Sequence, residues 1–226
     1  MREPGSENLY NMLIPFDYLF KKYDIRPFGV VHCGAHYGEE ALEYHKHGVK
    51  RVIWIEADPE SFLRLKQKTQ TYPDHTCLLA CISNEDHQIV DFHQASNNGQ
   101  SSSILPLGTH AQEHPTVKYV GKLKMETIRV DTLLNQNAIT ISKGQSWFAN
   151  LDVQGVELQA LESMGELLFR FDHIYCEVNE RELYKGCALV DEIDEYLDAF
   201  GFVRKETKMT KAGWGDALYC RFEYLS

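Results

Sequence analysis

The chain has 226 residues, of which 43% are hydrophobic and 25% charged, and its formal net charge is −10. These values are those of one globular domain or one and a half, and they argue against a nucleic-acid partner, because phosphate binding depends on clusters of Lys and Arg. No apolar run approaches the roughly 18 residues that span a membrane, and the opening Met-Arg-Glu-Pro-Gly-Ser lacks the apolar core of a secretory signal.

The six cysteines form no C-x-x-C pair, and four of them, Cys33, Cys77, Cys176 and Cys220, fall in strand-like apolar runs. A cysteine in such a run behaves as a small core residue. We therefore expect free thiols and a cytoplasmic protein.

The N-terminal part, residues 1–27, is predicted to be a helical segment ahead of a domain at residues 28–226. Apolar residues recur with a helical period between Leu9 and Lys22, and Pro15 interrupts them. Because proline is tolerated at the first turn of a helix, we expect the helix to begin near Pro15.

The stretch Phe28–Glu40, FGVVHCGAHYGEE, organises the chain. The apolar residues 29–31 predict a buried strand, which breaks into Gly34-Ala35-His36-Tyr37-Gly38 before a helix begins. Gly34 can take a positive φ and let a ligand approach the backbone, and the helix start offers free N–H groups. The spacing G-x-x-x-G without a Lys matches neither a dinucleotide fingerprint nor a triphosphate loop. It suits a ligand whose sugar and amino-acid tail lie against the loop, although an ordinary turn has the same glycines.

A second strand at residues 51–56 ends in Glu56, eighteen residues after Gly38. An acid at the tip of the second strand of a βαβ unit can accept hydrogen bonds from both ribose hydroxyls of an adenosine. Ala57-Asp58-Pro59 then leads into a helix at residues 60–69. The acid at this offset favours nucleoside binding over a simple turn.

A third strand at residues 75–80 completes a strand, helix, strand alternation that predicts right-handed crossovers and a parallel sheet. Ligands bind outside the carboxyl ends of such strands. Ile82 is therefore expected to flank the adenine ring, with Ser83 or Asn84 supplying a hydrogen bond; a plain polar turn is the alternative.

Residues 95–123 follow an added strand at 89–93 and are rich in Ser, Asn, Gly and Pro. A loop of this length in a compact domain is usually functional, and we expect it to be a lid that faces the substrate. His110 and His114 have the spacing of a metal pair on a helix, but Pro115 and the loop composition argue against a helix there. We expect no metal site.

Two further strand tips carry acids. The strand at 147–152 ends in Asp152, Gly155 breaks it, and a helix at 156–164 has Glu157 in its first turn. The strand at 173–179 contains Glu177 near its end. Asp152 is positioned to meet the reacting end of a cofactor, although an Asp at such a turn also serves as a helix cap.

A strand is predicted at residues 125–130, followed by a short helix at 130–134. After residue 179, an amphipathic helix is predicted at residues 189–200. Strands at 202–207 and 217–222 are predicted to form a closing antiparallel hairpin. Trp214 is expected in the connecting loop, where it could line the acceptor pocket or cover the sheet edge.

Three of these motifs together resemble the FkbM-type methyltransferases, which are class I enzymes dependent on S-adenosylmethionine. They are Gly34-Ala35-His36-Tyr37-Gly38, Glu56-Ala57-Asp58-Pro59 and Leu151-Asp152-Val153-Gln154-Gly155-Val156-Glu157. The last is the most specific, and the resemblance runs from about Val30 to Cys220. It implies an α/β, Rossmann-like fold: a seven-stranded, mostly parallel sheet with a C-terminal antiparallel hairpin strand and helices on both faces.

The resemblance also implies how the binding site is arranged. In the family, an N-terminal segment like residues 1–27 lies across the sheet edge or over the cofactor, although a plain packing helix fits this sequence equally well. The family usually carries an acid two residues before the first glycine, and this chain has His32. The ammonium group of the cofactor must therefore find its partner elsewhere, and His36 could contact the cofactor carboxylate.

We expect S-adenosylmethionine to bind His32, Gly34, Ala35, His36, Tyr37, Gly38, Glu56, Ala57, Ile82, Ser83 and Asp152. We expect the acceptor to bind Ser102, Ser103, Gln154, Glu157, Asn179 and Trp214. Asp152 or Glu177 is expected to be the general base that a hydroxyl acceptor needs, with a histidine from the lid as a further candidate.

The sequence thus predicts an O-methyltransferase for a hydroxyl of a small molecule, sugar or glycan, or natural-product scaffold. Its partners would be that acceptor, with no nucleic acid and no membrane, and homodimerisation stays open. Two alternatives remain. The first is a methyltransferase-like module that binds its ligand without turnover, which is consistent with His32 in place of the usual acid. The second is a nucleotide-dependent oxidoreductase, but the absence of a G-x-G-x-x-G motif argues against it.

Overall fold

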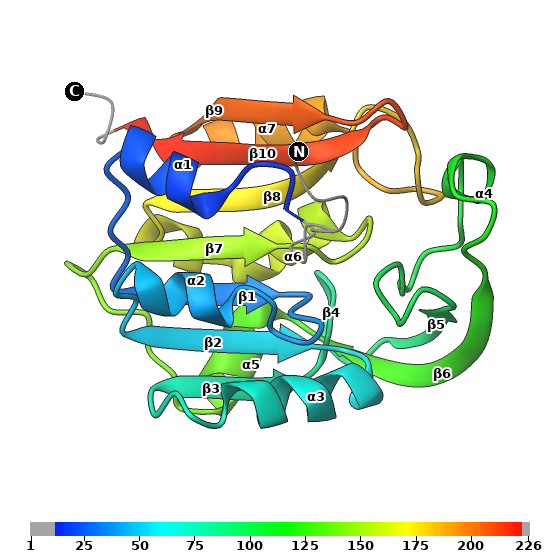
Figure 1. Cartoon of the computed structure of the whole chain (residues 1–226), viewed down its shortest axis with the longest axis horizontal. Helices are drawn as coiled ribbons and strands as arrows, with labels where there is room; N and C mark the ends of the chain where they lie inside the picture. The colour runs from blue at the N-terminus through cyan, green and yellow to red at the C-terminus, as the bar shows by residue number, and fades with distance from the viewer. Residues whose placement is uncertain (1–11, 223–226) are drawn as a thin grey trace, which may run out of the picture.

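A computed structural model describes residues 12–222 as an α/β structure built on a seven-stranded sheet in the order β3-β2-β1-β7-β8-β10-β9 (Figure 1). The strands of this sheet are β1 (Gly29–Cys33), β2 (Arg51–Glu56), β3 (His75–Leu79), β7 (Trp147–Leu151), β8 (His173–Asn179), β9 (Phe202–Met209) and β10 (Trp214–Arg221). The helices are α1 (Phe16–Lys22), α2 (Ala41–Lys46), α3 (Pro59–Thr69), α4 (His110–Glu113), α5 (Val130–Gln136), α6 (Glu157–Met164), the 3-10 helix η1 (Gly165–Arg170) and α7 (Val190–Asp198). The predicted fold class is confirmed, as are the predicted core strands to within a few residues.

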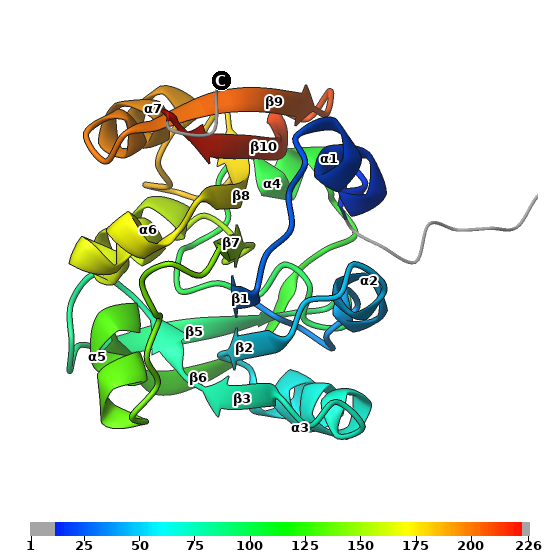
Figure 2. The same cartoon turned by 90° about the vertical axis from the view of Figure 1, so that its left-hand side faces the viewer.

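Helices cover both faces of this sheet because its central strands are apolar on both sides. In β1 every residue is buried, and the adjacent Val30 and Val31 point to opposite faces. Val30 belongs to a core formed with α1, α2 and α3, whereas Val31 belongs to one formed with α5, α6 and α7. The edge-on view shows these two helical layers (Figure 2). Such strands are expected in a parallel sheet, which buries both of its faces.

The C-terminal hairpin is the antiparallel part of the sheet. Strand β10 pairs antiparallel with both β8 and β9, so it lies between them. The expectation that Trp214 lies in the connecting loop is wrong: it is the first residue of β10 and pairs with Asn179 of β8. The hairpin turn is shorter than predicted because Gly213, with φ +83, makes a tight turn just before it.

A second, three-stranded sheet stands at the carboxyl ends of the parallel strands. It consists of β4 (Cys81–Ile82), β6 (Tyr119–Ile128) and β5 (Ile89–Ala95), in the order β4-β6-β5. The predicted lid, residues 95–123, is therefore shorter than expected, since β6 begins at Tyr119. The Ser-, Asn-, Gly- and Pro-rich composition ahead of it indicated a loop, but residues 119–123 belong to a half-exposed strand whose residues alternate in burial.

The lid segment, defined here as residues 96–118 between β5 and β6, also contains an unexpected helix. Its one turn, His110–Glu113, begins despite the following Pro115, because proline does not disturb a helix that ends before it. In Figure 1 the lid segment lies to the right of the carboxyl ends of the parallel strands, with α4 at its upper end, and its Leu107 bridges Tyr184.

The N-terminal helix begins after Pro15, as predicted, with the carbonyl of Pro15 accepting from the N–H groups of Tyr18 and Leu19. Its Phe16 packs against Phe148 of β7 and Tyr175 of β8, with ring centroids 5.7 and 5.6 Å apart. The helix therefore packs on a sheet face. The earlier part of its predicted period, from Leu9, lies partly outside the described residues.

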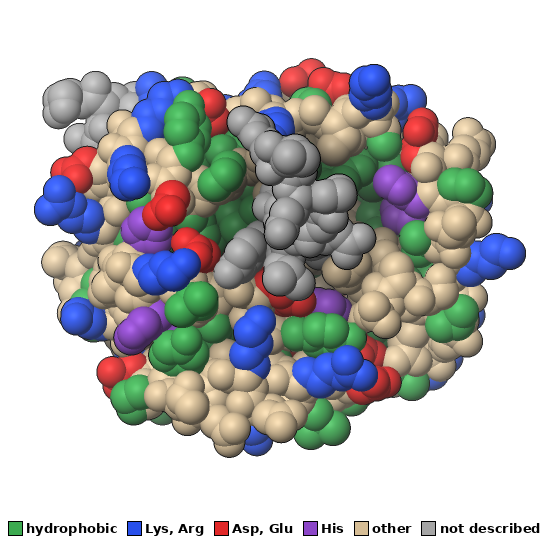
Figure 3. Space-filling model, viewed as in Figure 1, with side chains coloured by type: hydrophobic (Ala, Val, Ile, Leu, Met, Phe, Trp, Pro, Cys, Tyr) green, Lys and Arg blue, Asp and Glu red, His purple; other side chains and the backbone are tan. Residues whose placement is uncertain are grey.

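All six cysteines are free thiols, five of them buried, which agrees with the expectation drawn from their apolar surroundings. Within residues 12–222, no helix is long and apolar enough to cross a membrane. On the face of the molecule in Figure 3, Lys and Arg side chains are interspersed with Asp and Glu among the described residues.

Candidate active site

The glycine loop after β1 is held close to the end of β7. Gly34 has φ +79, and a Cβ at this position would stand 1.7 Å from the carbonyl oxygen of Asp152. The N–H groups of Gly34 and Ala35 both donate to the carbonyl of Ile55 in β2. Only glycine can satisfy both the positive φ and this approach, so the loop joins the ends of three neighbouring strands.

Glu56 ends β2 with a buried carboxylate. It accepts from the backbone N–H groups of His36 and Asp58, each at 2.7 Å. Burial raises the pKa of Glu56 to about 7, and these two hydrogen bonds oppose that rise. An ionised carboxylate can accept about four hydrogen bonds, so Glu56 retains acceptor capacity for a ligand.

A first cavity, here called the glycine-loop pocket, lies beside Gly34 and Glu56. It is lined by Gly34, His36, Ile55, Glu56, Ala57, Ala80, Cys81, Ile82, Phe92, Gly99, Gln100, Ser102, Ser103, Ile104, Asp152, Val153, Gln154 and Val156. Its apolar side chains, among them Ile55, Ile82 and Phe92, suit the flat base of a nucleoside, and the carboxylate of Glu56 suits ribose hydroxyls, which donate hydrogen bonds.

The lid segment closes over this pocket through two contacts. The carbonyl of Asn98 lies 2.9 Å from Nε2 of His36 and accepts from the hydroxyl of Tyr37 at 3.0 Å. On the other side, the hydroxyl of Ser103 donates to the carbonyl of Gln154 at 2.7 Å. His36 has a left-handed backbone, with φ +45, which aims its side chain at the lid.

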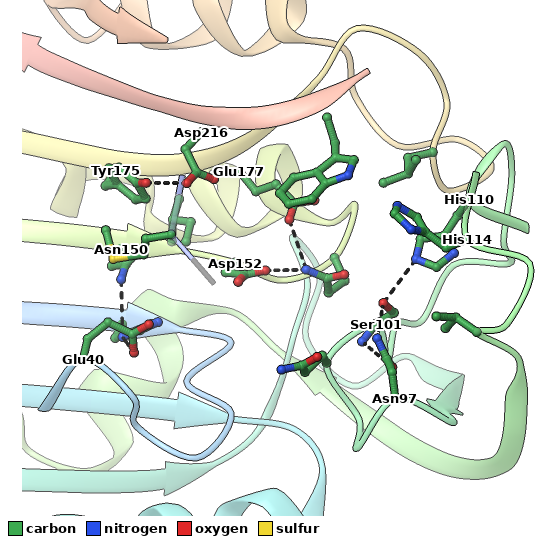
Figure 4. A pocket seen from close by; sticks show the side chains of 18 residues that line it. Glu40, Asn97, Ser101, His110, His114, Asn150, Asp152, Tyr175, Glu177 and Asp216 are labelled. Carbon is green, nitrogen blue, oxygen red and sulfur yellow. Dashed lines mark hydrogen bonds and ion pairs between the residues drawn. The ribbon is translucent and has the colours of Figure 1, made fainter. Parts of the chain in front are cut away.

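A second cavity, here called the acidic pocket, lies next to the first (Figure 4). It is lined by Met12, His32, Glu40, Asn97, Gln100, Ser101, His110, His114, Val117, Asn150, Leu151, Asp152, Gln154, Tyr175, Glu177, Leu183, Trp214 and Asp216. Four of these side chains are carboxyls, and no Lys or Arg lines the pocket among the described residues. Gln100, Asp152 and Gln154 line both cavities, so the two meet at the tip of β7.

Gln154 joins two of the carboxyls. Its side-chain amide donates to Asp152 and, at 3.1 Å, to Glu177, while its own carbonyl accepts from the hydroxyl of Tyr184 at 2.6 Å. Gln154 takes φ +53, an unfavourable conformation for a residue with a side chain. One amide thus holds two carboxylates that would otherwise repel each other.

The pKa values of these two carboxyls are raised. Burial is the main cause for both, and for Glu177 the carboxylates of Asp152, Glu157 and Asp216 add to it. The Oε1 atom of Glu177 is buried without a partner among the described residues. A carboxyl whose pKa lies above its usual range is a better proton acceptor once ionised.

The lid side of the acidic pocket is polar and carries two histidines. Nε2 of His110 lies 3.1 Å from the hydroxyl of Ser101, which accepts from the amide of Asn97 at 2.9 Å. The ring of His114 lies 4.9 Å from that of His110. Burial lowers the pKa of His110, which favours its neutral form, and this wall faces the carboxyls from the sheet (Figure 4).

Most of the predicted site residues line one of the two cavities. The predicted residues that line the glycine-loop pocket are Gly34, His36, Glu56, Ala57, Ile82, Ser102 and Ser103. Those that line the acidic pocket are His32, Glu177 and Trp214, and Asp152 and Gln154 line both. Ser102 and Ser103, expected on the acceptor side, thus face the cavity beside the glycine loop.

Six predicted site residues line neither cavity. They are Ala35, Tyr37, Gly38, Ser83, Glu157 and Asn179.

Three of these six have partners that explain their position. The carboxylate of Glu157 accepts from the N–H groups of Val153 and Gly155 at 3.0 and 3.1 Å, so it fixes the turn that carries Gln154. Ser83 donates to Gln159 of α6. A Cβ on Gly38 would meet Leu65 of α3, so this glycine serves helix packing.

Among the polar residues that the large sheet and the start of α2 contribute to the acidic pocket, four were missed by the sequence interpretation: Glu40, Asn150, Tyr175 and Asp216. Three of them are polar side chains inside otherwise apolar, buried strands, and that interruption was the available signal. Glu40 immediately precedes α2, where an acid is common for helix stability alone, so nothing in the sequence singled it out.

Comparisons with known proteins agree with this geometry. Residues 32–204 match the family model for the methyltransferase FkbM domain. A curated relative, the 2-O-methyltransferase NoeI of Sinorhizobium fredii, is 25% identical over 77% of this chain and 72% of its own length.

Solved structures with a similar arrangement include two bacterial methyltransferases. The magnesium protoporphyrin IX methyltransferase of Synechocystis is 13% identical, with a TM-score of 0.48 over 91% of this chain and 75% of its own. A methyltransferase from Aquifex aeolicus is 12% identical, with a TM-score of 0.46 over 90% of this chain and 87% of its own.

Proposed function

The chain belongs to the FkbM methyltransferase family and is an S-adenosylmethionine-dependent methyltransferase; from this premise we propose that it methylates a hydroxyl group of a small-molecule or sugar acceptor. The observation that carries the proposal is the junction of the two cavities. Asp152 lines both, so a group transferred at this point passes from one cavity to the other.

The glycine-loop pocket fits the nucleoside of the methyl donor. Glu56 would accept hydrogen bonds from the ribose hydroxyls, and Ile82 and Phe92 would pack against the adenine ring. The close approach of Gly34 to the backbone of Asp152 leaves the loop free of side chains where a ligand must pass. The bound cofactor supplies an electrophilic methyl group on a sulfonium.

The acidic pocket would hold the acceptor and its base. When the acceptor oxygen forms its bond to the methyl carbon, the carbon–sulfur bond breaks, its electron pair stays on sulfur, and the hydroxyl proton must leave. Asp152 and Glu177 are the carboxylates placed to take that proton, and the amide of Gln154 keeps both oriented toward one point. Proton transfer to a positioned base contributes typically about 10²–10⁴-fold to such rates.

The lining of the acidic pocket supports a neutral, hydroxyl-rich acceptor. Carboxylates, amides and the neutral form of His110 accept hydrogen bonds from hydroxyls, whereas a phosphorylated or carboxylated acceptor would meet four carboxyls without a Lys or Arg from the described residues. The printed name of the curated relative, a 2-O-methyltransferase, also supports oxygen as the receiving atom.

The test is a transfer assay with methyl-labelled S-adenosylmethionine and a panel of neutral sugars, hydroxylated metabolites and their phosphorylated counterparts. We expect label in at least one neutral hydroxyl compound and none in its phosphate ester. Transfer only to nitrogen or carbon atoms, or only to phosphorylated compounds, would contradict the proposal.

A further inference from the structure

Glu40 is a buried acid whose role is not explained by the fold. It immediately precedes α2, is 8% exposed and lines the acidic pocket beside His32 and Asn150 (Figure 4). Within residues 12–222, its carboxylate makes no hydrogen bond with another residue and meets only its own backbone N–H, and its nearest basic atom is Nδ1 of His32, 3.9 Å away. Burial raises the pKa of Glu40 to about 8, so near neutral pH it holds a proton unless a cation binds beside it and stabilises the ionised form.

His32 does not supply that cation. Burial lowers the pKa of His32 to about 3, so the ring is neutral at physiological pH. The amide of Asn150 donates to the hydroxyl of Tyr44 at 2.8 Å, and this leaves the hydroxyl proton of Tyr44 for Nδ1 of His32, 3.3 Å away. Because Nδ1 then accepts, it has no proton to give to Glu40.

The other three carboxyls of the acidic pocket already have donors. Asp216 accepts from the N–H of Leu13 at 2.6 Å and from the hydroxyl of Tyr175. Asp152 and Glu177 share the amide of Gln154. Glu40 therefore differs from them in lacking a donor from any other residue within 12–222.

The position of Glu40 relates it to the cofactor. It follows the glycine loop by two residues, and it lies in the same cavity as Asp152, where the two pockets meet. With the nucleoside beside Glu56, the amino-acid arm of the cofactor must leave the glycine-loop pocket at this junction. That arm ends in an ammonium group, which is the complement of an unpaired carboxylate.

We propose that Glu40 binds the ammonium group of S-adenosylmethionine. The inference rests on the proposed placement of the nucleoside in the glycine-loop pocket. It makes the acidic pocket a shared space: its Glu40 side holds the end of the cofactor, and its Glu177 side receives the acceptor.

Two ligands separate this role from a structural one. S-Adenosylhomocysteine carries the ammonium group, whereas 5′-methylthioadenosine has the same nucleoside and thioether but no amino-acid arm. In calorimetric titrations, Glu40→Gln should weaken binding of S-adenosylhomocysteine by about 10- to 100-fold, the loss expected for one charge-assisted hydrogen bond, and leave 5′-methylthioadenosine unchanged. Glu43→Gln, the same change one turn along α2, should alter neither.

The possible outcomes are distinct. Unchanged binding of S-adenosylhomocysteine to Glu40→Gln, or equal weakening of both ligands, would overturn the role of Glu40 and leave the methyltransferase assignment intact. Failure of the wild-type protein to bind S-adenosylhomocysteine at all would overturn the placement of the cofactor as well. Retained binding of 5′-methylthioadenosine shows at the same time that the variant is folded.

Discussion

The two cavities differ in how they are built. The glycine-loop pocket combines backbone and apolar side chains with two carboxyls, Glu56 and, where it meets the second cavity, Asp152, whereas the acidic pocket gathers four carboxyls opposite a wall that carries two histidines. We expect the first to recognise its ligand by shape and backbone approach, and the second by charge and hydrogen bonding. The difference teaches that the glycine loop and Glu56, which lie in one βαβ unit, can mark a cofactor site in the sequence, while the carboxyls of the acidic pocket come from distant parts of the chain.

The largest expected effect separates catalysis from cofactor binding. Asp152→Asn should lower the turnover number by about 10²–10⁴-fold if Asp152 is the base, because an amide cannot accept the hydroxyl proton. The dissociation constant for S-adenosylhomocysteine should change far less. Both are measured by steady-state assay and calorimetry, with the exposed Asp198→Asn as control.

Glu177→Gln distinguishes the two candidate bases in the same assay. If Asp152→Asn is mild and Glu177→Gln is severe, the base is Glu177. Turnover within about threefold of wild type for both variants would exclude a carboxylate base at this junction, since such a base contributes at least ~10²-fold.

The second effect tests the close contact between the cavities. Gly34→Ala should lower the free energy of unfolding by more than about 3 kcal/mol, because the new methyl group would collide with the carbonyl of Asp152 in addition to the strain of a positive φ. Gly48→Ala is the matched control, since Gly48 has φ +74 with nothing within 4 Å. Equal losses in chemical denaturation would mean that strain alone matters at Gly34.

The third effect sharpens the contrast between Glu56 and Glu40. Glu56→Gln removes an ionised acceptor from the ribose, so it should weaken S-adenosylhomocysteine and 5′-methylthioadenosine alike, by about 10- to 100-fold. Calorimetry with the exposed Glu60→Gln as control measures this. Weakening of only the ligand that bears the amino-acid arm would place Glu56 at the wrong end of the cofactor.

The smallest effect is a dependence of stability on pH. The buried carboxyls of the acidic pocket hold protons in the folded state that the unfolded chain has already released, since burial raises the pKa of Glu40 to about 8 and that of Glu177 well above its usual range. Raising the pH from 6.5 to 8 should therefore lower the free energy of unfolding of the ligand-free protein. The slope is about 1 kcal/mol per pH unit for each such group between its two pKa values.

Histidines contribute in the opposite direction at the lower end of this window. Burial lowers the pKa values of His32 and His75, so near pH 6.5 the unfolded chain still binds protons on them that the folded chain does not, and their contribution to stability rises with pH. A comparison of Glu40→Gln with the wild type cancels this contribution, because both proteins have the same histidines. In thermal melts, Glu40→Gln should lose less stability than the wild type as the pH rises from 6.5 to 8. An identical slope in the two proteins would mean that Glu40 is ionised in the folded state throughout this range.

The sequence allowed the sheet and the glycine-loop pocket to be predicted because their signals are local. A strand, a glycine turn and an acid at the next strand tip occupy one βαβ unit, and their spacing alone brings Gly34 near Glu56. The strand predicted at 147–152 and the fifth core strand at 173–179 were equally clear as apolar runs. Right-handed crossovers made a parallel sheet the expected outcome, but the strand order itself was not predicted.

The acidic pocket could not be predicted in the same way. Asp216 comes from the antiparallel strand β10, and Glu40 precedes α2, so their meeting depends on how three layers pack. The predicted lid, residues 95–123, was too long because the first part of β6 is half-exposed and has too few apolar residues to be distinguished from a loop. Glu157 was predicted to bind the substrate, but its carboxylate accepts from the N–H of Val153. The sequence does not show which N–H groups an acid in the first turn of a helix will accept from.

The most direct measurement of the central claim is a crystal structure of the complex with S-adenosylhomocysteine. The adenosine should lie in the glycine-loop pocket with both ribose hydroxyls on Glu56, and the sulfur should lie at Asp152, facing the acidic pocket. Adenosine bound instead in the acidic pocket, or a sulfur turned away from Asp152, would contradict the account of transfer from one cavity to the other.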